Sequence, residues 1–343
     1  MNDEPEANDP KDPNDAVEEF ERHRPHLLGI AYRLLGSMWD AEDVVADTLV
    51  RWLRIDPVDR ARVREPIAFL TTMVSRLALD QLRSARVRRE AYVGPWLPEP
   101  ALTGRGGPLD TLERRETLSL ATLHLLERLT PPERAVFILR EAFDVPYDQV
   151  AEILDVTPDG ARQLLHRARN RLGDDRRADR RDAVRFPPDP EEHQRLLDRL
   201  LRAMGSGDLH GLEDLLAAEA ISYSDGGGKG RASRRPIVGA QHIVKFLTGL
   251  ARRFGMGEPQ IVEANGLPAA LLTIGRQREL LAIDVREGKI QAIYNVINPD
   301  KLSYIDRQLS PASPASPAGP ASPASPASRA GPAPGSGSPS TPA

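Results

Sequence analysis

Arginine and polar side chains gather on one face of a short segment that ends at Leu172. They are Arg162, Gln163, His166, Arg167, Arg169 and Arg171. Arginine can form two hydrogen bonds with guanine, glutamine can form two with adenine, and guanidinium groups also bind phosphate. The residue types therefore indicate a helix that reads base edges near its start and holds a nucleic-acid backbone further along. The alternative is an ordinary basic helix face in contact with solvent.

Two helices and a tight turn are expected to position this face. Apolar side chains recur at helical spacing before and after a break at 155–158. The apolar positions are Val150, Ala151, Ile153, Leu154, Ala161, Leu164, Leu165, Ala168 and Leu172. Thr157 can cap the second helix, and Pro158 is tolerated at its first position, where the missing N–H has no partner. The pattern predicts a helix-turn-helix, with a plain helical hairpin as the alternative.

The composition limits the possible classes of protein. The chain has 343 residues, a net charge of −4 and no cysteine, which excludes disulfides, thiolate metal sites and thiol chemistry. The acidic, proline-broken N-terminus is unlike a signal peptide, and no apolar run approaches the ~20 residues that a membrane span requires. We expect a soluble cytoplasmic protein with no membrane partner, no metal and no cofactor.

Shifts in composition predict several parts of the chain. They are a disordered acidic tail (1–15), an α domain (16–90), a linker (91–110), a second α domain (111–175), a linker (176–189), an α+β domain (190–305) and a disordered Pro/Ala/Ser tail (306–343). The sequence thus indicates a multidomain protein with two all-α domains and one α+β domain.

The first α domain carries two groups of polar residues. Asp40, which is expected to cap a helix, lies close to Glu42, Asp43 and Asp47. These acids either interact favourably with the helix dipole or form a surface for a basic partner. The helix that opens at Pro66 exposes Ser75, Arg76, Gln81 and Arg83, which suit contacts with phosphate and base edges. Asp80 can pair with Arg83 or Arg76 along the helix, which is a sufficient structural reason for Asp80.

The linker contains a segment, YVGPWLPEP at 92–100, that cannot form a regular helix because of its three prolines. Trp96, Leu97 and Pro98 form its apolar centre. Because the segment cannot bury these side chains within itself, we expect them to occupy a groove formed by other domains.

The last third of the chain reads as two or three helices followed by a curled antiparallel sheet. Glu287 and Gly288 predict a hairpin turn between two of its strands. The segment SDGGGK contains Asp225, Gly226, Gly227, Gly228 and Lys229, whose glycines permit positive φ and close approach of another chain. The segment NPDKL contains Asn298, Pro299, Asp300, Lys301 and Leu302 and is expected to end the last strand in a turn.

Motifs along the chain resemble those of bacterial sigma factors of the extracytoplasmic-function (ECF) type, within the sigma-70 family. The segments around residues 29–52 and 66–84 are similar to sigma region two, and residues 129–172 are similar to region four. The segments WLPEP, SDGGGK and NPDKL resemble those of a subgroup with a fused C-terminal domain similar to SnoaL and ketosteroid isomerase. Together the motifs cover nearly all of residues 16–302.

The resemblance implies roles and partners. Asp40, Glu42, Asp43 and Asp47 would bind the clamp helices of the β′ subunit of core RNA polymerase, and the β flap would be a further contact. Ser75, Arg76, Gln81 and Arg83 would belong to the surface that recognises and melts the −10 promoter element. The helix ending at Leu172 would read the −35 element.

The resemblance also implies a regulatory domain in place of a separate anti-sigma protein. Trp96, Leu97, Pro98, SDGGGK and NPDKL would hold the domains together, and a small-molecule ligand could occupy the pocket of the SnoaL-like domain. If that domain were catalytic, the residues of suitable type would be Tyr223, Asp225, His242, Asp284 and Tyr294. Two other interpretations are a small-molecule enzyme fused to a DNA-binding module and a plain helix-turn-helix repressor.

Overall fold

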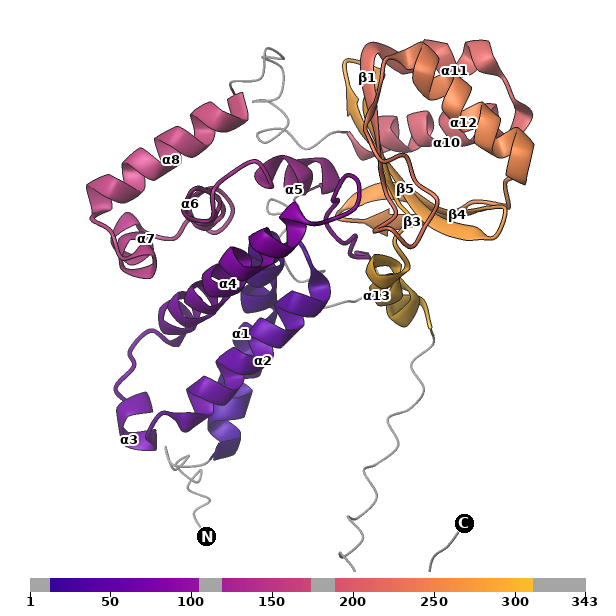
Figure 1. The fold of residues 1–343 in the computed structure, drawn as a ribbon. Helices are drawn as coiled ribbons and strands as arrows, with labels where there is room; N and C mark the ends of the chain where they lie inside the picture. Colours follow the sequence, from indigo (N-terminus) through magenta and orange to yellow (C-terminus); the bar gives the residue numbers. More distant parts are fainter. Residues whose placement is uncertain (1–12, 105–118, 174–188, 311–343) are drawn as a thin grey trace, which may run out of the picture. The chain divides into compact units, whose positions relative to one another are not determined.

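The computed structural model describes residues 13–104, 119–173 and 189–310, and gives only the backbone of residues 13, 14 and 85–90 (Figure 1). The helices are α1 (Pro13–Leu35), α2 (Met38–Arg54), α3 (Pro57–Arg60), α4 (Pro66–Glu90), α5 (Leu120–Leu126), α6 (Pro131–Glu141), α7 (Tyr147–Leu154), α8 (Pro158–Gly173), α10 (Pro190–Ser206), α11 (Leu209–Leu215), α12 (Ala240–Phe254) and α13 (Pro299–Leu309). The strands are β1 (Leu216–Asp225), β2 (Ile237–Val238), β3 (Gln260–Ala264), β4 (Leu267–Ile274), β5 (Gln277–Arg286) and β6 (Lys289–Val296). Most of the tails predicted over 1–15 and 306–343, residues 105–118 and most of the linker at 176–189 lie outside the described residues. The inner ends of both predicted tails are helical, since α1 begins at Pro13 and α13 ends at Leu309.

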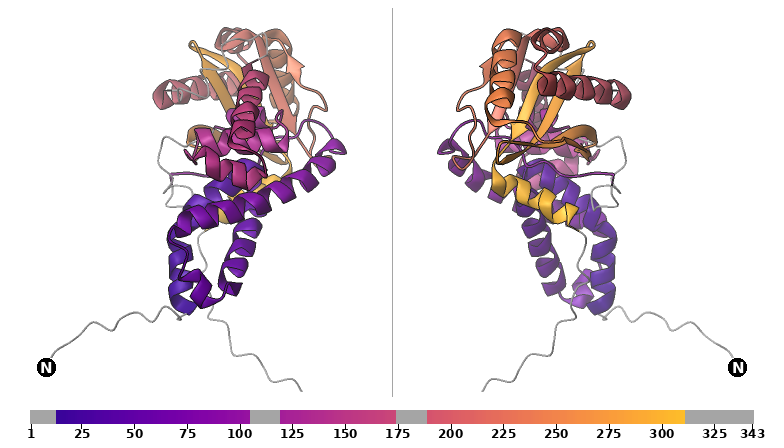
Figure 2. Two further views of the ribbon diagram at one scale, coloured as in Figure 1. Left: turned by 90° about the vertical axis from the view of Figure 1, so that its left-hand side faces the viewer. Right: turned by 90° about the vertical axis from the view of Figure 1, so that its right-hand side faces the viewer.

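The first α domain packs α1, α2 and α4 side by side, as both views of Figure 2 show. Gly36, at φ +69°, ends α1 in a conformation that side chains rarely adopt. The expectation that Asp40 caps the next helix is wrong. The cap is Ser37, whose hydroxyl accepts a hydrogen bond from the Asp40 backbone N–H at 3.2 Å. Asp40 instead lies in the first turn, where its negative charge interacts favourably with the positive end of the helix dipole.

The second α domain consists of α5 to α8 and contains the predicted helix-turn-helix. Thr157 accepts a hydrogen bond from the Gly160 backbone N–H at 3.1 Å, and Pro158 is the first residue of α8, as expected. Asp155, at φ +56°, forms the turn between α7 and α8. Ala151 and Ala161 are buried at their crossing, where small side chains allow the helices to approach.

The C-terminal domain is α+β, as predicted. Its sheet has six strands in the order β2-β1-β6-β5-β4-β3. The expected antiparallel sheet is only partly correct, because β1 pairs with β6 in parallel. A parallel pair requires a long connection, here the whole segment that contains β2, α12, β3, β4 and β5. Glu287 and Gly288 form the predicted hairpin turn, with φ of +51° and +68°.

Both faces of this sheet are buried. Alternate residues such as Leu272 and Leu281 pack with α10, α11 and α12, which lie together against one face (Figure 1). Their neighbours Leu271 and Leu280 pack instead with the linker residue Leu97, with α5 and with α13. Because successive strand residues point to opposite faces, the strands require apolar residues at almost every position. The second face of the sheet is thus covered by the linker, α5 and α13.

The segment NPDKL differs from its predicted turn. Asn298 is followed by α13, which continues to Leu309, beyond the expected domain boundary at residue 305. The Asn298 side chain accepts a hydrogen bond from the Asp300 backbone N–H at 3.1 Å, which supports the first turn of this helix. Helix α13 in place of a turn is important for function because its side chains contact the first α domain.

Candidate nucleic-acid interface and interdomain site

The basic face of α8 is exposed along its length. All six residues predicted to bind DNA there are exposed: Arg162, Gln163, His166, Arg167, Arg169 and Arg171. Arg162 pairs with Asp159 at 2.5 Å, Arg171 pairs with Glu133 at 2.6 Å, and Arg169 pairs with Glu141. The Arg162 pair is exposed on both sides and contributes little stability, so this guanidinium group can exchange its partner for phosphate at small cost. Glu133, by contrast, is buried, so Arg171 is held more firmly.

The surface predicted for the −10 element lies against α7. Arg76 donates hydrogen bonds to the Glu152 carbonyl at 2.7 Å and to its carboxylate at 3.3 Å. Gln149 donates to the Ala68 carbonyl at 2.7 Å and to the Thr72 hydroxyl at 3.2 Å. In this arrangement the second α domain covers part of the α4 surface that was predicted for the −10 element.

The other predicted −10 residues differ in accessibility. Ser75 is fully buried, so the expectation that it contacts DNA does not hold in this conformation. Its position on the inner side of α4, next to Val74, is the physical reason. Gln81 is half-buried, and Arg83 is exposed and pairs with Asp80 at 3.3 Å.

The acidic residues of α2 divide into two groups. Asp43 and Asp47 are exposed, whereas Glu42 is half-buried by α13. The Glu42 carboxylate accepts hydrogen bonds from the Tyr304 hydroxyl at 2.9 Å and from Arg307 at 3.2 Å. Burial, followed by this bond to Glu42, raises the pKa of Tyr304 above its ordinary value.

Trp39, next to Asp40, extends the contact between α2 and α13. Its ring meets the Tyr304 ring edge-on at 5.5 Å between centroids, and its indole N–H donates to the Ser303 hydroxyl at 3.2 Å. The Arg307 guanidinium lies 5.3 Å from the same ring. A helix of the C-terminal domain thus covers the start of the acidic helix.

The three motif segments meet at the carboxylate of Asp225, which is fully buried at the end of β1. One of its oxygens accepts from the Leu97 backbone N–H at 2.8 Å and from the Lys301 ammonium at 2.6 Å. The other accepts from the Tyr92 hydroxyl at 2.6 Å and the Gly227 backbone N–H at 3.1 Å. Burial, followed by the bond to Asp225, raises the pKa of Tyr92.

Lys301 is held on several sides. Besides Asp225 it donates to the Leu97 carbonyl, and its ammonium lies 3.9 Å from the centroid of the Trp96 ring. A desolvated cation over an indole face gains roughly 2 kcal/mol. The Trp96 and Leu97 pair therefore binds through backbone, apolar and cation–π contacts at once, which agrees with the expectation that they dock onto other domains.

The glycines of SDGGGK allow close approach. Gly227, at φ +57°, lies so near Asn298 that an added Cβ would be 2.3 Å from the Asn298 amide nitrogen. Asn298 in turn donates to the Tyr92 hydroxyl at 2.9 Å. Lys229 and Asp300 form an exposed ion pair at 2.5 Å beside this network.

The linker also contacts the first α domain. Glu99 accepts a hydrogen bond from the Met38 backbone N–H at 2.7 Å, and its own N–H donates to the Gly36 carbonyl at 2.8 Å. The Tyr32 hydroxyl donates to the Glu99 carbonyl at 2.7 Å and accepts from Asn265 of the C-terminal domain at 2.7 Å. Burial raises the pKa of Glu99. One extended segment is thereby bonded to both domains.

Of the residues considered for catalysis, the structure brings only Tyr223 and Tyr294 into ring contact. Tyr223 and Tyr294 stack with ring centroids 5.5 Å apart and both contact His124 of α5. Asp225 belongs to the buried network, Asp284 pairs with Arg286 at 3.1 Å, and exposed His242 bonds the Val238 carbonyl at 3.0 Å. Ordinary structural roles account for each of them.

Several residues at the domain contacts and at a cavity were not predicted from the sequence. Tyr92, Glu99, Tyr304 and Arg307 join the domains, and Glu279 and Asn295 are buried beside a cavity. Tyr92 and Glu99 lie within the proline-rich motif, so that motif could have indicated them. No local pattern marks the other four as functional, because the groups that they meet are distant in the chain.

Comparison with known proteins agrees with this architecture. Models of sigma-70 region 2 and sigma-70 region 4 match residues 20–88 and 119–172, which are the two α domains. The chain is 39% identical over 300 residues to the ECF RNA polymerase sigma factor SigJ of Mycobacterium tuberculosis (strain ATCC 25618 / H37Rv), covering 84% of this chain and 93% of that protein. It is 30% identical over 295 residues to the probable ECF RNA polymerase sigma factor SigI of Mycobacterium tuberculosis (strain CDC 1551 / Oshkosh), covering 84% and 94%.

A solved structure extends the likeness to the C-terminal domain. The crystal structure of Mycobacterium tuberculosis SigJ matches with a TM-score of 0.66 at 35% identity, over 84% of this chain and 98% of that chain. The predicted resemblance to ECF sigma factors and the predicted fold class, two all-α sigma domains with an α+β domain, are therefore confirmed. Within the described residues, none of the helices has the length and apolar character needed to cross a bilayer. The chain belongs to the ECF RNA polymerase sigma factors of the sigma-70 family, which act with core polymerase at promoter DNA in transcription initiation and are not enzymes.

Proposed function

We propose that this sigma factor is held in a closed state by its own C-terminal domain, without a separate anti-sigma protein. The main support for this proposal is that Tyr304 and Arg307 both donate hydrogen bonds to the Glu42 carboxylate. Glu42 belongs to the acidic surface that the family resemblance assigns to the β′ clamp helices. Helix α13 and core polymerase would then compete for the same side of α2.

The contacts of the linker support the same proposal. The Asp225 network and Glu99 attach one short segment to both the C-terminal domain and the first α domain. The bond between Arg76 and Glu152 covers part of the proposed −10 surface with the second α domain. Core polymerase would open the chain because it binds the open form more tightly than the closed form.

The DNA-binding assignments are part of the proposal. Arg162, Gln163 and His166 at the start of α8 would read the −35 element, while Arg167, Arg169 and Arg171 would hold phosphates. Arg76, Gln81 and Arg83 would serve at the −10 element once the second α domain has moved away. Asp40, Asp43 and Asp47 would join Glu42 in binding polymerase, with the β flap as the partner of the second α domain.

The proposal is tested by weakening α13 while keeping Glu42 intact. Tyr304→Phe combined with Arg307→Ala removes both bonds to Glu42. A loss of roughly 1–2 kcal/mol from the closed state is expected to raise the affinity for core polymerase about fivefold to thirtyfold. The measurements are the dissociation constant for core polymerase and the yield of run-off transcript, with exposed Arg252→Ala in α12 as the matched control.

Two outcomes would contradict the closed-state proposal. One is unchanged affinity in the double variant, which would mean that α13 does not compete with polymerase. The other is weaker binding and lower transcription, which would make α13 part of the polymerase-binding surface. Versions ending after Arg185 and after Asn298 extend the test, since removing α13 should raise transcription if it inhibits.

A further inference from the structure

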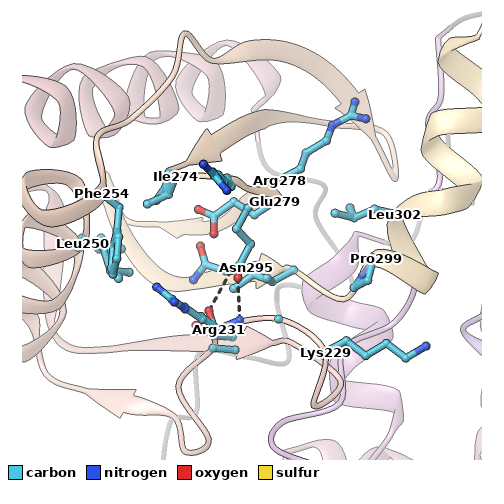
Figure 3. Close-up of a pocket in the computed structure, with 18 of the residues that line it drawn as sticks. Lys229, Arg231, Leu250, Phe254, Ile274, Arg278, Glu279, Asn295, Pro299 and Leu302 are labelled. Carbon is cyan, nitrogen blue, oxygen red and sulfur yellow. Dashed lines mark hydrogen bonds between the residues drawn. The ribbon is translucent and has the colours of Figure 1, made fainter.

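The C-terminal domain contains a cavity of about 760 Å³ between α12, the sheet and the start of α13. Figure 3 shows Leu250, Phe254 and Ile274 together on one side of it. Leu302 and Asp306 of α13 line it as well. This volume is typical of pockets that hold small organic molecules, and the wall formed by α12 and Ile274 is apolar, as is usual for such pockets.

Two buried polar side chains from neighbouring strands interrupt the apolar wall. Glu279 is 5% exposed, and no described residue donates a hydrogen bond to its carboxyl group. Asn295 is 3% exposed, and its Oδ1 has no hydrogen-bond partner among the described residues. Its Nδ2 is already used, donating to the Ser222 hydroxyl and the Tyr223 carbonyl at 3.2 Å each.

Both groups are oriented towards the cavity. Figure 3 shows the Glu279 carboxyl and the Asn295 amide directed towards Leu250 and Phe254. Burial raises the pKa of Glu279 to about 7, so near neutral pH a large share of this carboxyl carries its proton. The pair thus offers two hydrogen-bond acceptors and, on protonated Glu279, one donor.

Charges at the rim limit the kinds of ligand. Lys229, Arg231, Arg276 and Arg278 line the cavity, so an approaching cation is repelled. Lys229 pairs with Asp300 and Arg278 pairs with Asp306, which reduces the attraction for an anion at two of these four positions. Discrimination against an anion therefore depends on the buried end of the cavity. An anionic head beside Asn295 Oδ1 and the Glu279 carboxyl would meet acceptors. An uncharged hydroxyl group can donate to Asn295 Oδ1 and accept from the protonated Glu279 carboxyl.

We infer that this cavity is a binding site for an uncharged, mainly apolar small molecule whose hydroxyl or amide N–H group bonds to Glu279 and Asn295. Buried polar groups in proteins are nearly always hydrogen-bonded, and such a head group would supply the bonds that the protein leaves unmade. Its apolar body would lie against Phe246, Leu250 and Phe254.

The site shares α13 with the interdomain contact. Leu302 and Asp306 face the cavity, whereas Tyr304 and Arg307 of the same helix bond to Glu42. A ligand that packs on Leu302 therefore binds best while α13 is in place. If the closed state is as proposed, the ligand lowers the affinity of the chain for core polymerase. By linkage, core polymerase lowers the affinity for the ligand by the same factor.

The site is tested on the full chain with three related probes. They are 2-naphthol, which has a hydroxyl donor, naphthalene, which has none, and 2-naphthoate, which is anionic. Titration calorimetry should give a dissociation constant for 2-naphthol about fivefold to tenfold below that for naphthalene, as one hydrogen bond predicts. Binding of 2-naphthoate should be weaker than that of 2-naphthol.

Variants locate the binding. Glu279→Leu removes the carboxyl while keeping an apolar side chain, so it should abolish the preference for 2-naphthol over naphthalene. Leu250→Trp should fill the cavity and weaken both probes at least tenfold. Glu258→Leu, outside the cavity, is the control and should change neither.

Several results would overturn the site. They are no binding of 2-naphthol, equal affinity for naphthol and naphthalene, preference for naphthoate, or an unchanged preference in Glu279→Leu. Equal affinity would mean that water already satisfies the two acceptors. If naphthol binds as expected but leaves the affinity for core polymerase unchanged, the closed-state proposal fails and the site stands.

Discussion

The Lys301 ammonium lies 2.6 Å from the Asp225 carboxylate, and both side chains are almost completely buried. The two residues come from different motifs, and the same carboxylate bonds to the linker at Leu97. A single ion pair therefore joins the end of β1, the start of α13 and the segment between the two α domains.

The first prediction concerns this buried pair. Lys301→Met leaves Asp225 as an uncompensated buried charge, so the free energy of unfolding should fall by about 3–5 kcal/mol. Urea denaturation followed by circular dichroism measures it. Lys229→Met removes the exposed pair with Asp300 and should cost less than about 1 kcal/mol. Equal losses in the two variants would show that burial of the Lys301 pair does not matter. Asp225→Asn added to Lys301→Met should recover part of the loss.

The second prediction concerns the close approach at Gly227. Gly227→Ala places a methyl group 2.3 Å from the Asn298 amide and also strains a backbone at φ +57°. We expect a loss of about 1–3 kcal/mol and faster proteolysis of the linker at 92–104, because the bonds of Tyr92 and Asn298 must shift. Gly249→Ala in α12 meets no atom within 4 Å and should be neutral or stabilising by up to about 1 kcal/mol. Similar behaviour of the two variants would contradict a packing role for Gly227.

The third prediction is the pH dependence contributed by Glu279. Its pKa of about 7 in the folded chain is above the ordinary 4.5, so the folded state holds this proton more tightly. The stability from this group is complete below about pH 4.5 and is lost as the pH rises through about 7. The difference between the two pKa values corresponds to roughly 3 kcal/mol.

Glu279→Gln removes this contribution because the amide does not titrate. Between about pH 4.5 and pH 8, the free energy of unfolding of the variant should therefore fall less than that of the unaltered chain, by roughly 3 kcal/mol. Glu258→Gln, at an exposed position, should keep the original slope. Parallel curves for the chain and Glu279→Gln would show that the carboxyl is not desolvated in solution.

The fourth prediction separates base reading from phosphate binding on α8. Gln163→Ala should reduce discrimination at one position of the −35 element by about 1–3 kcal/mol and leave the salt dependence unchanged. Arg167→Ala should weaken binding to all sequences alike and lower the slope of log affinity against log salt by about 1. Fluorescence anisotropy with promoter variants at several salt concentrations measures both. A change of sequence preference in Arg167→Ala would reverse the assignment.

Features governed by neighbouring residues follow from the sequence. Thr157 and Pro158 begin α8, and Glu287 and Gly288 form the hairpin turn, because capping and turn geometry depend on a few consecutive residues. The docking of Trp96 and Leu97 also follows, since three prolines prevent the segment from burying them alone. The order of the motifs was sufficient to identify the family.

Tertiary structure alone decided which distant groups meet. The parallel pairing of β1 with β6, the contact of α13 with Glu42 and the burial of Ser75 each depend on segments far apart in the chain. Glu279 and Asn295 follow the ordinary alternation of two strands and became candidates only when the folded sheet placed them beside one cavity. Local propensity fixes where helices and turns begin, whereas burial and partner choice are set by packing across the whole fold.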